Sequence, residues 1–360
     1  MEFGIVSRMT QGLFRYQGWP TVARDDRGTL YAAASGHRLG HVCPFGKNLL
    51  YVSHDQGSTW SAPQIINDTF LDDRDAGLCA WGSGNLMLTW FNLPPAPMYE
   101  REGQYPSLAN PLARGAQEYW KQLPAEDLIP GSFCRVSHDG GNTWSEIRKA
   151  PVTAPHGPTV TPEGKLFYLG KEFFSGDPSL KEDHIYAFQS RDEGRTWEKL
   201  CQIPLPGEWT VSVLHEPHAV CLPDGTILGG LRITSDKLPG DRDGIFTTIS
   251  CDGGKTFSPP QLLDVSGTPP HFLLHSSGAV VLVYGRRAKP CGQRARISYD
   301  GGSTWSAEIV ISPEAPTWDH GYPSSVELSD GSILTVYYQR YENDDYNSVL
   351  YTKWELPRED

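Results

Sequence analysis

Five near-copies of one eight-residue motif recur along this chain of 360 residues. They are SHDQGSTW (53–60), SHDGGNTW (137–144), SRDEGRTW (190–197), SCDGGKTF (250–257) and SYDGGSTW (298–305). The Asp of this motif can accept hydrogen bonds from backbone N–H groups two or three residues further on, and a Gly can take a positive φ. The final Trp or Phe offers a large surface for packing. The motif, called the Asp motif below, therefore predicts a tight turn between two strands in which the Asp is structural.

A second pattern, made of a short strand, a glycine-containing turn and an apolar strand, recurs six times. Its copies start at residues 18, 75, 156, 216, 269 and 321, and all but the last precede an Asp motif. A repeat of about 50 residues is typical of one four-stranded blade of a β-propeller. The sequence therefore predicts one all-β domain over 1–357, a six-bladed β-propeller of four-stranded antiparallel blades with five Asp-motif turns. Residues 3–8 are expected to close the last blade as a shared strand, because closure removes exposed edges.

The widest spacing between two Asp motifs contains an insertion at 93–132, in the second blade. It includes LPPAPMYEREGQYPSLANP and the helix-like segment LARGAQEYWKQL. Loops of this length inside a compact domain are usually functional or disordered. We expect the insertion to form a lid over the pocket; surface decoration is the alternative.

Charge and composition restrict the partners. The net charge is −12 and no basic run occurs, so nucleic acid and acidic membranes are poor partners. The seven cysteines lie far apart without a CxxC pair, which indicates neither a disulfide framework nor a zinc site. We predict no cofactor and no metal. The N-terminal residues lack the pattern of a signal peptide and no apolar run approaches about 18 residues, so we expect a cytoplasmic protein.

Several chemically active side chains stand at the start of the six repeats. In a propeller the first strand of every blade lines the central channel, so these residues should meet at the mouth of the channel. They are Trp19, Arg74, Asp75, His156, Glu216, His218, His271 and Tyr322. The three histidines are substrate-binding candidates, with a hydrogen bond to a neighbouring strand as the alternative.

Arginines end the second strand of three repeats. They are Arg38, Arg232 and the pair Arg286-Arg287. Guanidinium groups suit a carboxylate because their paired N–H donors match its two oxygens. In an acidic protein, such a cluster indicates an anionic ligand, with local ion pairs as the alternative.

These motifs resemble the sialidase (neuraminidase) superfamily over nearly the whole chain. EPHAVCLPDGTILGGLR resembles the segment with a catalytic Glu and the second carboxylate-binding arginine, here Glu216 and Arg232. VLVYGRR resembles the segment with the third arginine, here Arg287, and DHGYPSSVEL the segment with the tyrosine nucleophile, here Tyr322. The resemblance implies an exo-acting glycoside hydrolase that releases a terminal α-linked sialic acid or related acidic sugar. A neutral Tyr, deprotonated by Glu, suits an anomeric carbon that carries a carboxylate.

The sequence departs from this family at two places. Gly18-Trp19-Pro20 stands where the family has Arg-Ile-Pro, so Arg15, Arg38 or Arg74 would have to replace the first arginine. The loop at 37–48 lacks the acid/base Asp and offers His41 and Cys43 instead. His41 and Asp75 are therefore the alternative proton donors.

Two other functions stay open from the sequence. One is a propeller hydrolase or lyase that acts on uronic-acid or other plant glycans with His and Tyr. The other is a glycan-binding propeller that has kept the pocket and lost the chemistry, since loss of an acid/base group is what such a change would leave.

Overall fold

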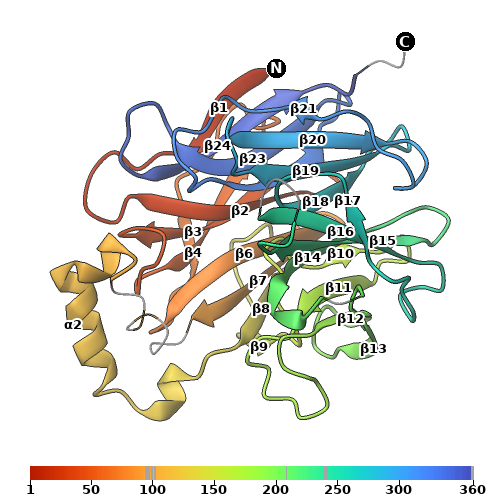
Figure 1. Ribbon diagram of the computed structural model, residues 1–360. Coiled ribbons are helices and arrows are strands. Elements are labelled where there is room, and N and C mark those ends of the chain that lie inside the picture. The colour runs from red at the N-terminus through yellow and green to blue at the C-terminus, as the bar shows by residue number, and fades with distance from the viewer. Residues whose placement is uncertain (94–97, 99, 101–102, 208, 239–241, 358–360) are drawn as a thin grey trace.

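The computed structural model describes residues 1–93, 98, 100, 103–207, 209–238 and 242–357. It contains six four-stranded antiparallel sheets arranged as a β-propeller (Figure 1). The inner strand of each blade contacts the inner strand of the next, and β22 contacts β2 to complete the ring. The predicted fold class is therefore confirmed.

The first five blades each contain four strands that are consecutive in the chain. Blade 1 contains β2 (Tyr16–Arg24), β3 (Leu30–Arg38), β4 (Lys47–Ser53) and β5 (Gln64–Asn67), and blade 2 contains β6 (Asp72–Trp81), β7 (Asn85–Leu93), β8 (Ser132–Ser137) and β9 (Arg148–Lys149). Blade 3 contains β10 (Thr159–Val160), β11 (Leu166–Lys171), β12 (Ile185–Ser190) and β13 (Glu198–Gln202). Blade 4 contains β14 (Leu214–Cys221), β15 (Ile227–Thr234), β16 (Asp243–Ser250) and β17 (Gln261–Leu263), and blade 5 contains β18 (Thr268–Leu274), β19 (Val280–Arg286), β20 (Gly292–Ser298) and β21 (Ile309–Val310).

The sixth blade joins the two ends of the chain. Its strands are β22 (Gly321–Glu327), β23 (Ile333–Arg340), β24 (Asn347–Trp354) and, at the outer edge, β1 (Glu2–Ser7). β1 pairs antiparallel with β24, with Phe3 opposite Thr352. The prediction of a shared N-terminal strand is confirmed, and it begins one residue earlier than expected.

The five Asp motifs connect the third and fourth strands of blades 1 to 5. In the first copy, Asp55 accepts hydrogen bonds from the backbone N–H and the hydroxyl of Thr59, at 2.8 and 2.6 Å. The carboxylate therefore bonds four residues ahead rather than the two or three expected. These bonds, the hydroxyl bond foremost, lower the pKa of Asp55 to about 2. The other four copies repeat the same bonds, so the Asp residues staple turns.

The aromatic residue of each Asp motif packs at the interface between its own blade and the preceding blade. Trp144 of blade 2, for example, packs on a cluster that joins Leu50 of blade 1 to Leu88 of blade 2. Trp60, Trp197, Phe257 and Trp305 occupy the equivalent clusters. The core of the protein is thus a set of separate apolar layers between blades, because each sheet is covered on both faces.

Short helices lie in the insertion of blade 2. They are η1 (Pro106–Ala109), α2 (Pro111–Trp120) and η2 (Ala125–Leu128), and α2 confirms the helix expected there. The insertion has a small core of its own, in which Leu108 and Trp120 pack with Val42 of the loop after β3. In Figure 1 α2 stands to one side of the sheets. Residues 94–97, 99 and 101–102 of the predicted lid lie outside the described residues.

One short 3₁₀-helix, η3 (Val211–Val213), precedes β14. Among the described residues, no helix combines the length and apolar character needed to cross a membrane.

Candidate active site

A recurring backbone irregularity turns side chains toward the mouth of the channel. In four inner strands the pairing register shifts, and one residue there takes a left-handed conformation. These residues are Trp19 (φ 52°), Asp75 (52°), Glu216 (41°) and Tyr322 (51°). Left-handed φ is uncommon and unfavourable for bulky non-glycine residues, and such strain clusters at functional sites. The strain therefore coincides with the residues that the sequence singled out.

Tyr322 and Glu216 meet across the channel. The hydroxyl of Tyr322 donates a hydrogen bond of 2.6 Å to Oε1 of Glu216. Arg232 Nη1 donates to Oε2 of the same carboxylate at 2.6 Å and lies 3.3 Å from the hydroxyl of Tyr322. The two residues that the resemblance implies as base and nucleophile therefore lie within hydrogen-bonding distance of each other.

The electrostatics of this pair favour a neutral phenol beside an ionised carboxylate. Burial raises the pKa of Tyr322 well above its usual value, and the charge of Glu216 raises it further against the opposing effect of Arg232. Burial also acts to raise the pKa of Glu216. The Arg232 charge and the Tyr322 hydrogen bond outweigh that effect, so the pKa of Glu216 lies below its usual value.

Arg287 adds a second positive charge next to this pair. Its guanidinium approaches Asp243 at 3.9 Å, and Arg232 approaches the other carboxylate oxygen of Asp243 at 3.7 Å. Nε of Arg287 is buried with no hydrogen-bond partner among the described residues. Arg232 and Arg287 therefore flank one site, and Arg287 has donor capacity that the described residues leave unused.

Asp75 shares a pocket with Glu216. This Glu216 pocket, of about 260 Å³, is walled by Phe91, Phe173 and Lys171 among others. Burial raises the pKa of Asp75 to about 7; Arg74 opposes the rise and Glu216 adds to it. Asp75 is thus a carboxyl group that keeps its proton up to about neutral pH.

The structure corrects the role expected for Arg38. Its side chain is fully buried and binds both oxygens of Asp72, so it is not available to a ligand. Arg74 also contacts Asp72, at 3.2 Å, but keeps some exposure and stacks on the ring of Trp19 at 4.1 Å. Arg74 is therefore better placed than Arg38 to face a ligand. Arg15 pairs with the exposed Asp345.

His41 belongs to a second group of residues. Its Nδ1 lies 2.8 Å from Oδ1 of Asp319, and its ring packs edge-on against Trp19 at 5.1 Å. Burial lowers the pKa of His41 below its usual value, although Asp319 acts against this. His41 is therefore largely neutral at pH 7.

The three channel histidines pack together beneath Tyr322. Ring centroids lie 4.3 Å apart for His218 and His271 and 5.0 Å apart for His156 and His271, and His156 is 6.3 Å from Tyr322. Nδ1 of His218 accepts from the backbone N–H of Phe272 at 3.0 Å. All three are almost fully buried, with pKa values lowered by burial. Nδ1 of His271 likewise accepts from the backbone N–H of Ser325 at 3.4 Å. His218 and His271 are thus hydrogen-bonded to a neighbouring inner strand, which favours the alternative interpretation over substrate binding. No cluster able to hold a metal ion occurs among the described residues.

Four residues of the site were missed in the sequence. Asp243 begins β16, Asp319 is the first residue of the DHGYPSSVEL motif, Trp318 directly precedes that motif, and Tyr105 lies in the insertion. The place of Asp319 inside a motif already singled out was a usable signal. Asp243 gave none, because it occupies the third strand of its blade, outside both repeats.

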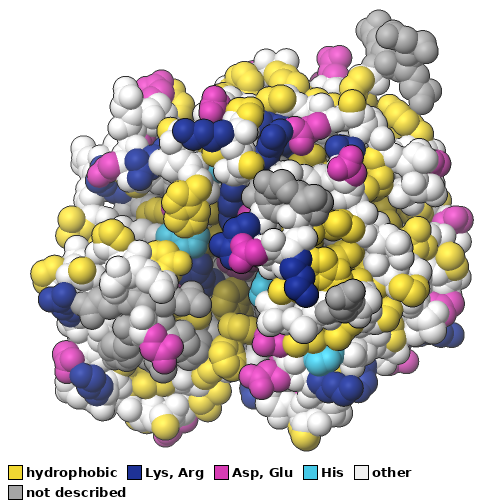
Figure 2. Space-filling view, viewed as in Figure 1, with side chains coloured by type: hydrophobic (Ala, Val, Ile, Leu, Met, Phe, Trp, Pro, Cys, Tyr) yellow, Lys and Arg dark blue, Asp and Glu magenta, His cyan; other side chains and the backbone are white. Residues whose placement is uncertain are grey.

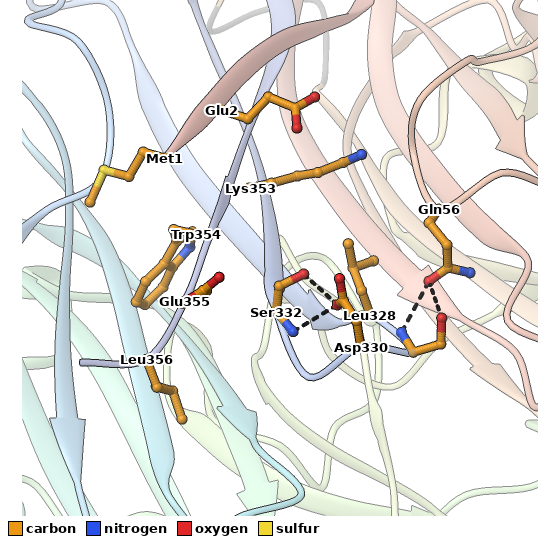
Figure 3. A pocket seen from close by; sticks show the side chains of 11 residues that line it. Met1, Glu2, Gln56, Leu328, Asp330, Ser332, Lys353, Trp354, Glu355 and Leu356 are labelled. Atoms are coloured by element: carbon orange, nitrogen blue, oxygen red, sulfur yellow. Dashed lines mark hydrogen bonds between the residues drawn. The ribbon is translucent and has the colours of Figure 1, made fainter. Parts of the chain in front are cut away.

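Figure 2 shows a hollow near the middle of this face, in which basic, acidic and histidine side chains gather. A larger cavity, of about 800 Å³, lies instead between Glu2 of β1 and Leu356, which follows β24 (Figure 3). There Asp330 accepts hydrogen bonds from Ser332, and Gln56 accepts from the backbone N–H and hydroxyl of Ser329 in the same turn. Its polar groups therefore stabilise turns, and the chemistry points instead to the Glu216 pocket, where Tyr322 binds Glu216.

Family models agree with the repeats of the six-bladed propeller. A family model described as BNR repeat-like domain matches residues 136–336, and a BNR/Asp-box repeat matches residues 51–62. The chain therefore belongs to the family of the BNR repeat-like domain, whose model covers more than half of its 360 residues.

Individual relatives are distant. Sialidase-2 of Cricetulus griseus is 31% identical over 108 residues, which is 29% of this chain and only 25% of that relative. A protein of unknown function from Dyadobacter fermentans matches with a TM-score of 0.76 at 22% identity, over 99% of this chain and 98% of that one. NanB sialidase from Streptococcus pneumoniae gives 0.71 at 13% identity, over 98% of this chain and 70% of that one. At these identities the structures establish the fold.

Proposed function

We propose that this protein is an exo-acting glycoside hydrolase that releases a terminal α-linked sialic acid or a related acidic sugar. The observation that carries the proposal is the 2.6 Å hydrogen bond between Tyr322 and Glu216, with Arg232 bound to the same carboxylate. A nucleophile hydrogen-bonded to its base, with a third group that orients the base, is the usual arrangement for covalent catalysis. The structural likeness to proteins titled sialidases supports the same reaction class.

In the first step Tyr322 attacks the anomeric carbon and its proton passes to Glu216. A sialic acid carries a carboxylate on that carbon, which would repel a charged nucleophile, so a neutral phenol is suitable. Arg287, together with Arg232, binds the substrate carboxylate through charged hydrogen bonds. The bond between the anomeric carbon and the leaving-group oxygen breaks as the bond to Tyr322 forms.

Asp75 is our candidate for the proton donor to the leaving group. It lines the same pocket as Glu216, and its pKa of about 7 keeps the proton available in the range where Glu216 is ionised. His41 is the weaker candidate, because its lowered pKa leaves it largely unprotonated. In the second step water attacks the anomeric carbon and the ionised Asp75 takes a proton from that water. The bond between the anomeric carbon and the Tyr322 oxygen breaks, and Glu216 returns its proton to that oxygen.

One observation favours an acidic sugar other than the commonest sialic acids. Gly18 stands where the resemblance implies the first arginine, and Trp19 fills the space beside it, with 1% of its surface exposed. The carboxylate site therefore lacks an arginine at position 18, and Arg232 and Arg287 beside Tyr322 are partly balanced by Asp243. A sugar whose acidic group sits differently, such as a uronic acid, is the second candidate substrate.

Turnover of aryl glycosides tests the proposal. We expect the wild type to release the aryl alcohol from an acidic-sugar glycoside, sialoside or uronide, and not from the matched neutral glycoside. Tyr322→Phe should abolish release while an acidic sugar still binds. Tyr337→Phe, which removes another buried hydroxyl, bonded to Thr352, is the control and should stay near wild type. Release by Tyr322→Phe at the wild-type rate would disprove the mechanism.

A further inference from the structure

Asp243 lies between the two arginines that stand beside Tyr322. It begins β16, the third strand of blade 4, and its side chain is 10% exposed. Oδ1 of Asp243 lies 3.7 Å from Nη2 of Arg232, and Oδ2 lies 3.9 Å from Nη1 of Arg287. The proposed function uses both arginines and assigns this carboxylate no part in the reaction.

The two contacts of Asp243 with the arginines are attractions between charges rather than hydrogen bonds, because an N–H···O bond is about 2.7–3.2 Å long. Other groups hold Arg232 in place. Its Nη1 donates to Glu216 at 2.6 Å, and its Nε donates to the hydroxyl of Thr234 at 3.2 Å. Thr234 donates in turn to Oδ1 of Asp243 at 2.7 Å, which fixes the carboxylate. The charge of Asp243 can therefore be removed without releasing Arg232.

The charges of these four side chains are balanced before a ligand arrives. The guanidinium groups of Arg232 and Arg287 face the carboxylates of Glu216 and Asp243. A bound sugar carboxylate has to share the arginines with Asp243, and two like charges that lie close together repel each other. Asp243 therefore weakens the hold of the two arginines on an anionic ligand.

The same balance acts when Tyr322 passes its proton to Glu216. The positive charge of Arg232 opposes this transfer, because it holds the pKa of Glu216 below its usual value. Asp243 stands at the other terminal nitrogen of the same guanidinium and offsets part of that charge. A carboxylate nearby also favours a transition state that is cationic at the anomeric carbon.

We propose that Asp243 is a positioning residue that acts through Arg232 and Arg287: it limits how tightly they hold an anionic sugar and allows Glu216 to accept the proton of Tyr322. This rests on the proposed function. Substrate binding is weaker than two unopposed arginines would make it, the acidic product leaves more readily, and the base keeps its strength. Asp243 thus lowers affinity and raises turnover.

Titration of N-acetylneuraminic acid and glucuronic acid, each compared with its carboxamide, tests the inference. Asp243→Asn keeps the shape of the side chain and an oxygen that can accept from Thr234, and it loses the charge. We expect the dissociation constant of the acid to fall by about tenfold, as for the loss of one repelling charge, and that of the carboxamide to stay near the wild-type value.

Asp264→Asn is the matched control for the loss of a nearby charge. Asp264 lines a pocket of about 230 Å³ together with Asp243, is exposed, and forms no ion pair with Arg232 or Arg287 among the described residues. Its replacement should leave the binding of both acids near the wild-type level.

Steady-state kinetics with an aryl glycoside of the acidic sugar distinguishes a charge effect from a structural one. Asp243→Asn should lower KM and kcat together, each by about tenfold, because the substrate binds more tightly while the base weakens and the product leaves more slowly. A variant that merely misplaced Arg232 would raise KM and would overturn the inference.

The binding and kinetic results separate this inference from the proposed function. Tighter binding of an acid to Asp243→Asn, without turnover of any acidic glycoside, would support the charge balance and remove the hydrolase. Equal or weaker binding of the acids to Asp243→Asn would overturn the inference, whatever the enzyme hydrolyses. Failure of both proteins to bind either acid would overturn the inference and the proposed function together.

Discussion

The hydroxyl of Tyr322 lies 2.6 Å from Oε1 of Glu216, although 106 residues separate the two in the chain. Both occupy left-handed bulges at the start of inner strands, β22 and β14. The propeller therefore builds the pair before any ligand arrives, and backbone strain fixes the direction of both side chains. A base that is already bonded to its nucleophile needs no rearrangement to take the proton.

Removing the base should slow the reaction without unfolding the protein. For Glu216→Gln we expect kcat to fall by about 10²–10⁴-fold, the usual contribution of a positioned acid or base. The amide keeps the shape of the side chain and loses only its charge and proton affinity. Glu327→Gln, which alters a surface carboxylate that caps Ser276, should remain at wild-type rate. Steady-state kinetics measures both, and an unaffected kcat in Glu216→Gln would remove Glu216 from the mechanism.

Two adjacent arginines should differ sharply in their effect on binding. Arg287 faces the site, whereas Arg286 pairs with Glu308 at 3.1 Å. Replacing Arg287 by Ala should raise KM for an acidic substrate by about 10- to 100-fold, as expected for a charged hydrogen bond worth about 1.5–3 kcal/mol. Arg286→Ala should change KM by less than threefold. Similar KM values for the two variants would contradict the assignment of Arg287 to the carboxylate.

The pH dependence of kcat/KM should reflect the ionisation of Asp75. Its folded pKa is raised to about 7, so the acid form disappears and kcat/KM should fall as pH rises through about 7. On the acidic side, activity should hold until Glu216 takes up a proton, below its usual pKa.

Asp75→Asn should abolish the alkaline fall and slow a substrate with a sugar leaving group by about 10²–10⁴-fold. A nitrophenyl leaving group, which needs little protonation, should be slowed far less. If the alkaline fall persists in Asp75→Asn and disappears in His41→Asn, the proton donor is His41.

Alanine substitution of two neighbouring glycines in one Asp motif should distinguish the cost of backbone strain from the cost of overpacking between blades. Gly253 and Gly254 both have a left-handed φ, 74° and 88°. A Cβ on Gly254 would lie 2.6 Å from the ring of Phe167 in the preceding blade, whereas one on Gly253 would have no atom within 4 Å. Both Ala variants should lose about 1–2 kcal/mol of unfolding free energy through backbone strain. Gly254→Ala should lose about 1–3 kcal/mol more through overpacking.

Denaturant unfolding of the two glycine variants measures this difference directly. Phe257 of this Asp motif packs on a cluster that joins blades 3 and 4, which indicates that the motif helps to fix the contact between them. Equal losses of unfolding free energy in the two variants would contradict that role.

The fold could be predicted from the sequence because its signals are local. An Asp motif is a turn of eight residues, and six strand–turn–strand repeats count the blades. Glu216, Arg232, Arg287 and Tyr322 could be found for the same reason, since each lies in a recognisable segment. The ion-pair partners that determine whether each side chain can bind a ligand could not be predicted, because these ion pairs form between strands that lie far apart in the sequence. Arg38 looked equivalent to Arg232, yet Asp72 of the next blade binds it fully. Asp319 lay within the tyrosine motif, but its partners Tyr16, His41 and Tyr338 come from distant parts of the chain and could not be read from the sequence.

Trapping of the glycosyl-enzyme tests the central claim most directly. A 2,3-difluoro derivative of the acidic sugar should react once, because fluoride leaves from C2 while the fluorine on C3 slows the cationic transition state of the second step. Mass spectrometry of the digested protein should then find the fluorinated sugar on the peptide that contains Tyr322, and no adduct in Tyr322→Phe. An adduct on another residue would contradict the account. Hydrolysis of acidic glycosides by the Tyr322→Phe variant would contradict it as well.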